Sequence, residues 1–96
     1  KIWPAEVEAL LYGHPAVQEA CVIGMRDAHR GESAKAVIVL REGHEASEQD
    51  IIDWARGHMA AYKVPQAVEF RSALPRSGTG KVQWRALQDA EDGRAS

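Results

Sequence analysis

Two glycines, a threonine and a lysine lie close together near the C-terminus, in the segment Ser77-Gly78-Thr79-Gly80-Lys81. Glycine lets a backbone take φ > 0 and lie close to a ligand, and lysine carries a compact charge on a flexible stem that suits a phosphate or a carboxylate. The segment is not a P-loop, which needs glycine and serine or threonine where Pro75 and Val82 stand. The pattern therefore predicts a mobile loop that presents Lys81 to an anion.

Further motifs precede this segment and lead into it. In chain order they are Pro4-Ala5-Glu6-Val7-Glu8, His14-Pro15-Ala16-Val17, Gly31-Glu32, Tyr62-Lys63-Val64-Pro65, Val68-Glu69-Phe70 and Leu74-Pro75-Arg76-Ser77-Gly78-Thr79-Gly80-Lys81. Their order and spacing resemble the end of the adenylate-forming acyl-CoA synthetase family. The resemblance covers residues 1–88, which it identifies as a C-terminal lid domain, and leaves 89–96 as a frayed polar tail.

In that family, the lysine at the place of Lys81 serves adenylation, in which a carboxylate and ATP give an acyl-adenylate and pyrophosphate. The resemblance makes Gly78, Thr79 and Gly80 the loop that presents this lysine. Two anions must approach each other in this step, so a cation that touches both offsets their repulsion and holds the geometry of attack. Arginine is not an equivalent, because its planar fork differs in reach and shape.

The resemblance also implies a second surface, which meets coenzyme A during thioester formation. Lys1 and Arg30 match basic positions that can meet the CoA phosphates, and Val64 falls where some members pack the adenine. ATP and CoA are thus expected as substrates, with Mg²⁺ in the full enzyme and no cofactor bound by this domain alone. The implied partners are a carboxylic acid and a large N-terminal domain, on which the lid docks in two orientations.

Other functions stay open. The chain can also be the lid of a peptide-synthetase adenylation domain or of a luciferase-like ligase, or a stand-alone module that binds a small ligand. A carrier domain following Ser96 would favour the peptide synthetase, in which a carrier-protein arm replaces CoA as the thiol acceptor. Because the resemblance assigns the ATP and acyl pockets to another domain, we expect the isolated chain to be inactive.

Length and composition limit the class of protein. The chain has 96 residues, of which 45% are hydrophobic and 27% charged, which indicates one small globular domain. A net charge of −2 gives no reason to expect nucleic acid as a partner, and no apolar run approaches the roughly 20 residues of a membrane span. With a single cysteine and no visible signal peptide, we expect the cytoplasm. The chain starts at Lys1 without a methionine, so we expect a fragment of a longer protein.

The hydrophobic pattern predicts helices at 4–11, from Ser47 to Pro65 and at 84–88, and strands at 17–25, 36–40 and 68–71. Asp50 follows Ser47 by three residues, as in a capping box. Residues 26–33 are predicted to be a polar connection between the first two strands. A hairpin and a crossover helix then give an α+β fold, a two-layer α/β sandwich with a small three-stranded sheet.

Several side chains are expected to have structural roles only. In the first strand, Val17, Cys21, Ile23 and Met25 are predicted to share one face. Cys21 is expected to be a small buried residue rather than a nucleophile. His14 and His58 are placed at the edge of the core, and Trp54 and Trp84 are interpreted as packing residues. No metal site is expected, because the histidines and the cysteine lack ligand spacing.

Overall fold

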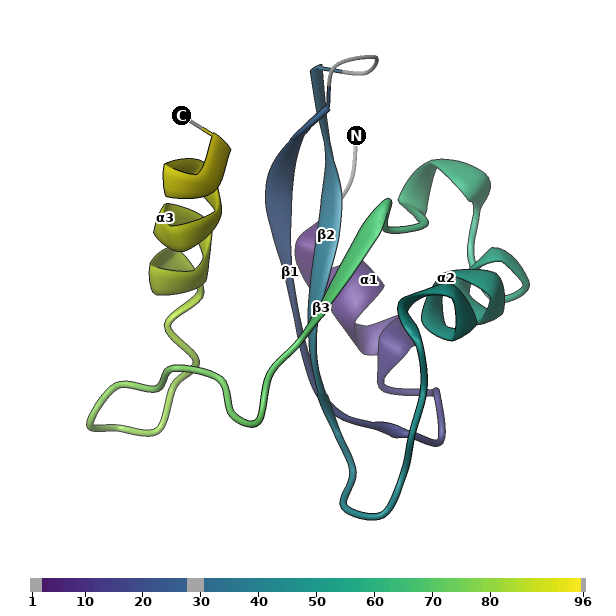
Figure 1. Ribbon diagram of the computed structural model, residues 1–96, viewed down its shortest axis with the longest axis horizontal. Helices are drawn as coiled ribbons and strands as arrows, with labels where there is room; N and C mark the ends of the chain where they lie inside the picture. Colours follow the sequence, from purple (N-terminus) through teal and green to yellow (C-terminus); the bar gives the residue numbers. More distant parts are fainter. Residues whose placement is uncertain (1–2, 28–30, 96) are drawn as a thin grey trace.

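A small mixed sheet forms the centre of the computed structural model, which describes residues 3–27 and 31–95 (Figure 1). Its strands are β1 (Val17–Asp27), β2 (Gly31–Leu40) and β3 (Ala67–Phe70), in the order β1-β2-β3. β1 and β2 are antiparallel, whereas β3 runs parallel to β2. The chain is therefore α+β with three strands, as the sequence predicted.

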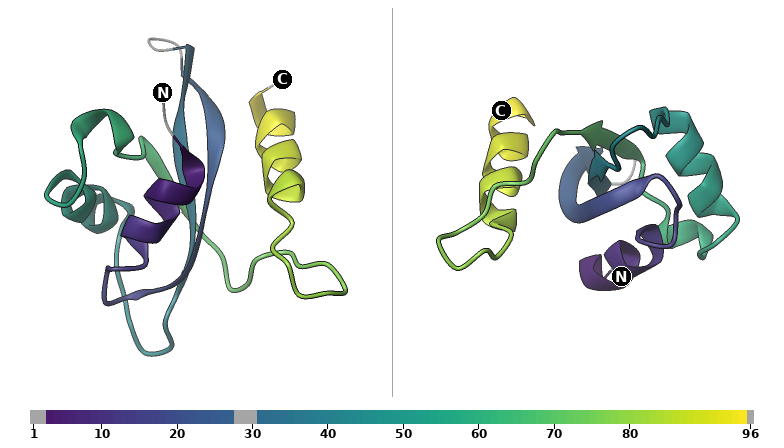
Figure 2. Two further views of the ribbon diagram at one scale, coloured as in Figure 1. Left: turned by 180° about the vertical axis from the view of Figure 1, so that it is seen from behind. Right: turned by 90° about the horizontal axis from the view of Figure 1, so that it is seen from below.

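Helices cover both faces of this sheet. α1 (Pro4–Leu11) and α2 (Glu48–Arg56) pack on one face, and α3 (Trp84–Ala95) lies against the other (Figures 1 and 2). The sheet with α1 and α2 makes the two predicted layers, and α3 adds a cover on the far side. β2 is central and buried from Ser33 to Val39, which confirms the interpretation of its apolar run.

Two hydrophobic clusters flank the sheet. The cluster between the sheet and the helices α1 and α2 consists of Val7, Leu11, Val17, Ala20, Val22, Ala34, Ala36, Ile38 and Ile51. The cluster on the α3 side consists of Cys21, Ile23, Val37, Val39, Leu74 and Leu87. Alternate residues of β2 contribute to the two clusters, as the pleat of a strand requires. The second cluster is what α3 covers.

α2 begins as predicted but ends earlier. The Ser47 hydroxyl accepts a hydrogen bond from the Asp50 amide, and the Asp50 carboxylate accepts one from the Ser47 amide, which confirms the capping box. The prediction of a helix up to Pro65 is wrong, because α2 ends at Arg56 and a separate 3-10 turn, η1, spans Ala61–Lys63. Gly57 disfavours the helix after Arg56, and Ala60 has an extended backbone.

The predicted polar connection at 26–33 is largely part of the sheet. β1 continues to Asp27 and β2 starts at Gly31, with Arg26 paired to Glu32. Both of these side chains are exposed. A ladder of backbone hydrogen bonds does not depend on apolar side chains, so the hairpin projects beyond the core without a hydrophobic signal.

A β-bulge in β1 separates residues that the sequence placed on one face. The register shifts between Val17 and Glu19, so that Val17 pairs with Leu40 and Glu19 with Val39. Val17 consequently packs below α1 and α2, whereas Cys21 and Ile23 belong to the cluster on the α3 side. The prediction that Val17 shares a face with Cys21 is therefore wrong, because one extra residue reverses the alternation.

α3 is longer than the sequence predicted. The frayed polar tail expected at 89–96 is instead helical through Ala95. Gln88 explains how the helix docks, because its side-chain amide accepts from the Gly24 amide at 2.8 Å and donates to the Gly24 carbonyl at 3.0 Å. Further along, Glu91 is buried and Arg94 pairs with Glu69 of β3. These polar contacts stabilise a helix whose sequence carries little hydrophobic pattern.

Candidate functional site

The Lys81 segment is a small hairpin between β3 and α3. Arg76 and Val82 form an antiparallel bridge. The Ser77 amide donates to the Lys81 carbonyl at 2.9 Å, and the Gln83 amide donates to the Pro75 carbonyl at 2.8 Å. The expected mobile loop is thus a turn with its own hydrogen bonds, extending beyond the sheet at the lower left of Figure 1.

The two glycines of this hairpin have different roles. Gly80 has φ +85°, a left-handed conformation that favours glycine, and its amide donates to the Ser77 carbonyl at 2.9 Å. Gly78 has no such backbone. The hydroxyls of Ser77 and Thr79 are 2.9 Å apart and bond to each other across the tip. Only Gly80 is therefore required by the backbone, at the residue directly before Lys81.

Lys81 is exposed, and no acidic group of the described residues forms an ion pair with it. The lysines at 35 and 63 differ, since both are paired with glutamates. An unpaired ammonium on a short, hydrogen-bonded turn is well placed to meet an anion from outside the chain. The catalytic role of Lys81 itself stays a prediction.

Arg76 connects this hairpin to the sheet. Its guanidinium donates to the Gly80 carbonyl at 2.6 Å and forms an ion pair with Glu19 of β1. The sequence interpretation assigned no role to either residue. A basic residue after Pro75 was visible, but its contact with Glu19 joins residues 57 apart in the chain, and no sequence pattern indicated it.

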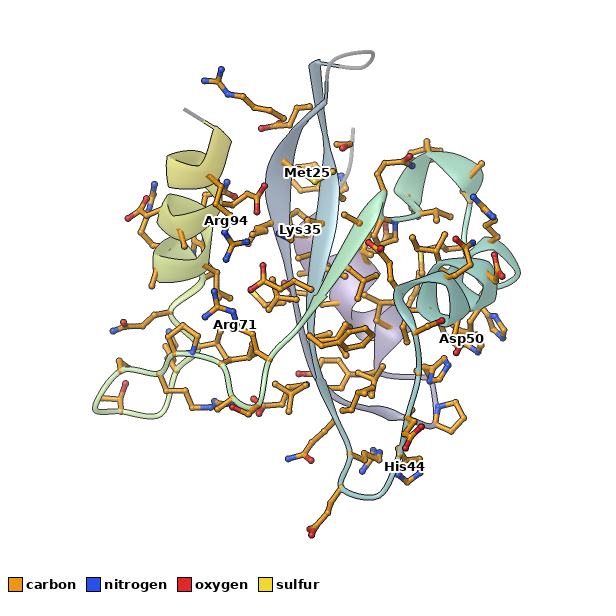
Figure 3. All side chains as sticks on the ribbon, viewed as in Figure 1. Met25, Lys35, His44, Asp50, Arg71 and Arg94 are labelled. Atoms are coloured by element: carbon orange, nitrogen blue, oxygen red, sulfur yellow. The ribbon has the colours of Figure 1, made fainter. Side chains whose placement is uncertain are left out.

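A second group of charged residues links α3 to the sheet. The Lys35 ammonium lies 2.9 Å from a Glu69 oxygen and 2.6 Å from a Glu91 oxygen, and Arg71 and Arg94 each lie 2.7 Å from Glu69. Figure 3 shows Lys35, Arg71 and Arg94 on the side of the sheet that faces α3. These contacts hold α3, the helix that follows the hairpin, against the sheet.

These contacts shift the acid–base properties of the group. Hydrogen bonds from Arg94, with Lys35 and Arg71, lower the pKa of Glu69 to about 2, against partial burial that raises it. Burial lowers the pKa of Lys35, but its hydrogen bonds to Glu91 and Glu69 outweigh this effect and leave that pKa above its ordinary value. Glu69 and Lys35 therefore stay charged near neutral pH.

Of the three residues predicted to bind CoA, the structure describes Val64. Lys1 and Arg30 lie outside the described residues. Val64 is only 5% exposed and packs in one cluster with Ile52 and Ala55 of α2. α2 lies on the opposite side of the sheet from α3 and the hairpin (Figure 2). A contact between Val64 and an adenine stays a prediction.

Other sequence interpretations concern packing. Cys21 is buried, and burial together with the nearby Glu8 carboxylate raises its pKa to about 11, so the thiol is not a thiolate nucleophile. Trp54 packs against the core with His14 at its edge, but His58 is exposed and stacks on Trp54 at 3.9 Å. Trp84 is 50% exposed rather than packed, with the Arg85 guanidinium 4.6 Å from its ring.

In residues 3–27 and 31–95, no group of three or more His, Cys, Asp or Glu side chains could hold a metal ion. Within the same residues, no helix has the length and apolar character needed to cross a membrane.

Comparisons with known proteins agree on the kind of domain. Residues 6–81 match the family described as AMP-binding enzyme C-terminal domain. The chain is 46% identical over 90 residues to a long-chain-fatty-acid–CoA ligase of Bacillus subtilis, covering 94% of this chain and 16% of that protein. The chain therefore spans about one sixth of the length of this curated relative.

Solved structures give the same result for the fold. An anthranilate CoA ligase in complex with anthranoyl-AMP superposes with a TM-score of 0.88 at 42% identity, over 98% of this chain and 19% of that chain. ATP-bound MatB from Rhodopseudomonas palustris superposes with a TM-score of 0.86 at 34% identity, over 93% of this chain and 18% of that chain.

Proposed function

This chain belongs to the AMP-binding enzyme C-terminal domain family, the C-terminal domain of adenylate-forming acyl-CoA synthetases, and from this premise we propose that it is the mobile lid of an ATP-dependent acid–CoA ligase. In this role it docks on a large N-terminal domain and supplies Lys81 to the adenylation step. We place the end of the lid at the end of α3, because Glu91 and Arg94 contact the sheet.

The exposed, unpaired ammonium of Lys81 on its hairpin carries this proposal. In adenylation, an oxygen of the carboxylate attacks the α-phosphorus of ATP, and the bond from that phosphorus to pyrophosphate breaks. Lys81 contacts the carboxylate and the α-phosphate, so that its charge offsets their repulsion and stabilises the charge that develops during attack. A lysine already paired within the domain would have to give up its partner first.

The similar proteins support this reaction and not a particular substrate. One is named for a fatty acid, another was solved with anthranoyl-AMP and a third with ATP. The first two act on different acids although both resemble this domain, so we propose that the absent large domain selects the acid. Because these two are named CoA ligases, they favour CoA over a carrier-protein arm as the acceptor. We also assign the Mg²⁺ that accompanies ATP to the large domain, and the enzyme to the cytoplasm.

The experiment for this function compares the full-length protein with the isolated chain. With ATP, Mg²⁺, CoA and a panel of carboxylic acids, the full-length protein is expected to catalyse acid-dependent exchange of pyrophosphate into ATP and to form acyl-CoA. The 96-residue chain should do neither, because one lysine cannot replace an ATP site. Acyl-CoA formation by the isolated chain would overturn the lid assignment.

We further propose that Lys1 and Arg30 meet the CoA phosphates in the thioester-forming orientation of the lid. Arg30→Ala in the full-length enzyme should raise the KM for CoA roughly tenfold, since a charge-assisted hydrogen bond contributes about 1.5 kcal/mol. The rate of pyrophosphate exchange should not change, because adenylation uses the Lys81 hairpin. Steady-state titration of CoA against exchange in the same preparation checks this, and equal losses in both would exclude a specific CoA contact.

A further inference from the structure

We propose that Arg76 is a positioning residue for adenylation, which acts by fixing the peptide group that precedes Lys81. The inference rests on the proposed function of Lys81. It goes beyond that function because it assigns the orientation of Lys81 to a specific pair of residues, Arg76 and Glu19, on two different elements.

Arg76 contacts the peptide group that joins Gly80 to Lys81. One of its nitrogens, Nη1, donates to the Gly80 carbonyl at 2.6 Å, and the other, Nη2, pairs with the Glu19 carboxylate. The Gly80 carbonyl belongs to the peptide bond that joins Gly80 to Lys81. Arg76 therefore links the backbone immediately before Lys81 to β1, across 57 residues of sequence.

The tip of the hairpin has few other anchors. Gly78, Thr79, Gly80 and Lys81 are all exposed, so no packing holds them. Leu74 and Val82 join the cluster on the α3 side, but they anchor only the base. Hydrogen bonds within the turn shape it without fixing its direction relative to the sheet. The Arg76 contact with Glu19 is the described interaction that does so.

Glu19 is placed for this contact by the alternation of β1. The strand pairs regularly with β2 from Glu19 onward, and Cys21 and Ile23 belong to the cluster on the α3 side. Glu19 precedes Cys21 by two residues and therefore lies on the same side of the sheet. Its side chain is only 18% exposed and pairs with Arg76 of the hairpin.

An arginine suits this double contact better than a lysine. Its planar fork can present two N–H groups to two acceptors at once, whereas an ammonium on a flexible stem has no such fixed geometry. The conservative variant Arg76→Lys should keep the ion pair with Glu19 and lose the simultaneous bond to Gly80. This difference separates a positioning role from a general need for positive charge.

The test measures both half-reactions of the full-length enzyme. Arg76→Ala should lower the kcat of adenylation about tenfold, since misplacing a catalytic group is costly, and leave thioester formation from supplied acyl-adenylate within twofold. Arg76→Lys and Glu19→Gln should give smaller losses of the same kind. Arg56→Ala is the matched control, because it removes an exposed arginine whose ion-pair partner among the described residues is Asp53 on α2.

A double-variant cycle decides whether Arg76 acts through Lys81. If it does, Arg76→Ala should slow adenylation in the wild type but have no further effect in the Lys81→Ala background. Hydrogen exchange of the Ser77 and Gly80 amides should rise in both Arg76→Ala and Glu19→Gln, with no change in the protection of β2.

The outcomes separate this inference from the function on which it rests. The positioning role is overturned if Arg76→Ala and the milder Glu19→Gln slow both half-reactions equally. It is also overturned if Arg76→Ala causes its full loss of adenylation in the Lys81→Ala background. If Lys81→Ala alone leaves adenylation intact, the proposed function fails. If Lys81→Ala cripples adenylation while neither Arg76→Ala nor Glu19→Gln affects it, only the positioning role is wrong.

Discussion

Replacing Lys81 by alanine in the full-length protein should slow adenylation about 10²–10³-fold, the loss typical when one preorganised electrostatic contact to a transition state is removed. The effect should appear in kcat, because the charge matters most while carboxylate and α-phosphate approach. Thioester formation from supplied acyl-adenylate should stay near the wild-type rate. Folding should also be unaffected, since the Lys81 side chain is exposed and forms no ion pair with a described residue.

Two further variants make this test specific. Lys81→Arg keeps the charge but changes its shape, so most of the loss should remain if a compact ammonium is required. Lys63→Ala removes a lysine that is instead paired with Glu6 at 2.7 Å, and it should leave adenylation unchanged. The measurement is pyrophosphate exchange beside a separate thioester assay. If the Lys81→Ala variant keeps near-normal pyrophosphate exchange, Lys81 is an ordinary surface lysine.

The elements with local signals could be predicted from the sequence. Ser47 and Asp50 fix the start of α2 through bonds between residues three apart, so the sequence alone contains the information. The central position of β2 follows similarly from its continuous apolar run. Lys81 was identified because its motif is contiguous. In each case the physical cause lies within a few residues.

The features that the sequence did not predict depend on distant partners. α3 beyond Gln88 has a polar sequence, and its contacts include Arg94 with Glu69, which are 25 residues apart. The bulge in β1 needs only one extra residue and leaves no signal in composition, yet it reverses the face of Val17. Glu19 was missed because its partner Arg76 is 57 residues away in the chain. This contact was thus harder to predict than the contiguous motif that contains Lys81.

Lys35→Met should reduce the free energy of unfolding of the chain by about 3 kcal/mol, because it leaves the buried Glu91 carboxylate without its closest cation. Lys35 and Glu91 are only 8% and 9% exposed, and their charged atoms are 2.6 Å apart. Methionine fills a similar volume, so the loss reflects charge rather than a cavity. Urea unfolding followed by tryptophan fluorescence measures it at neutral pH.

The pH dependence of the stability tests the same charged group independently. The pKa of Glu69 is lowered from 4.5 to about 2 in the folded chain. Its contribution to stability is therefore fully present above pH 4.5 and is lost as the pH falls towards 2. Lys35→Met removes one of the three cations around Glu69, so the decline of stability across this range should become shallower than in the wild type.

A second substitution identifies which carboxylate causes the loss. Lys35→Met combined with Glu91→Leu removes both members of the closest pair, while Glu69 keeps its bonds to Arg71 and Arg94, each at 2.7 Å. Replacing a buried ion pair by apolar residues is often neutral or stabilising, whereas removing one partner is not. The double variant should therefore regain most of the stability that the single variant lost. If it is as unstable as Lys35→Met, the uncompensated Glu91 charge is not the cause, and α3 is held to the sheet by its other contacts.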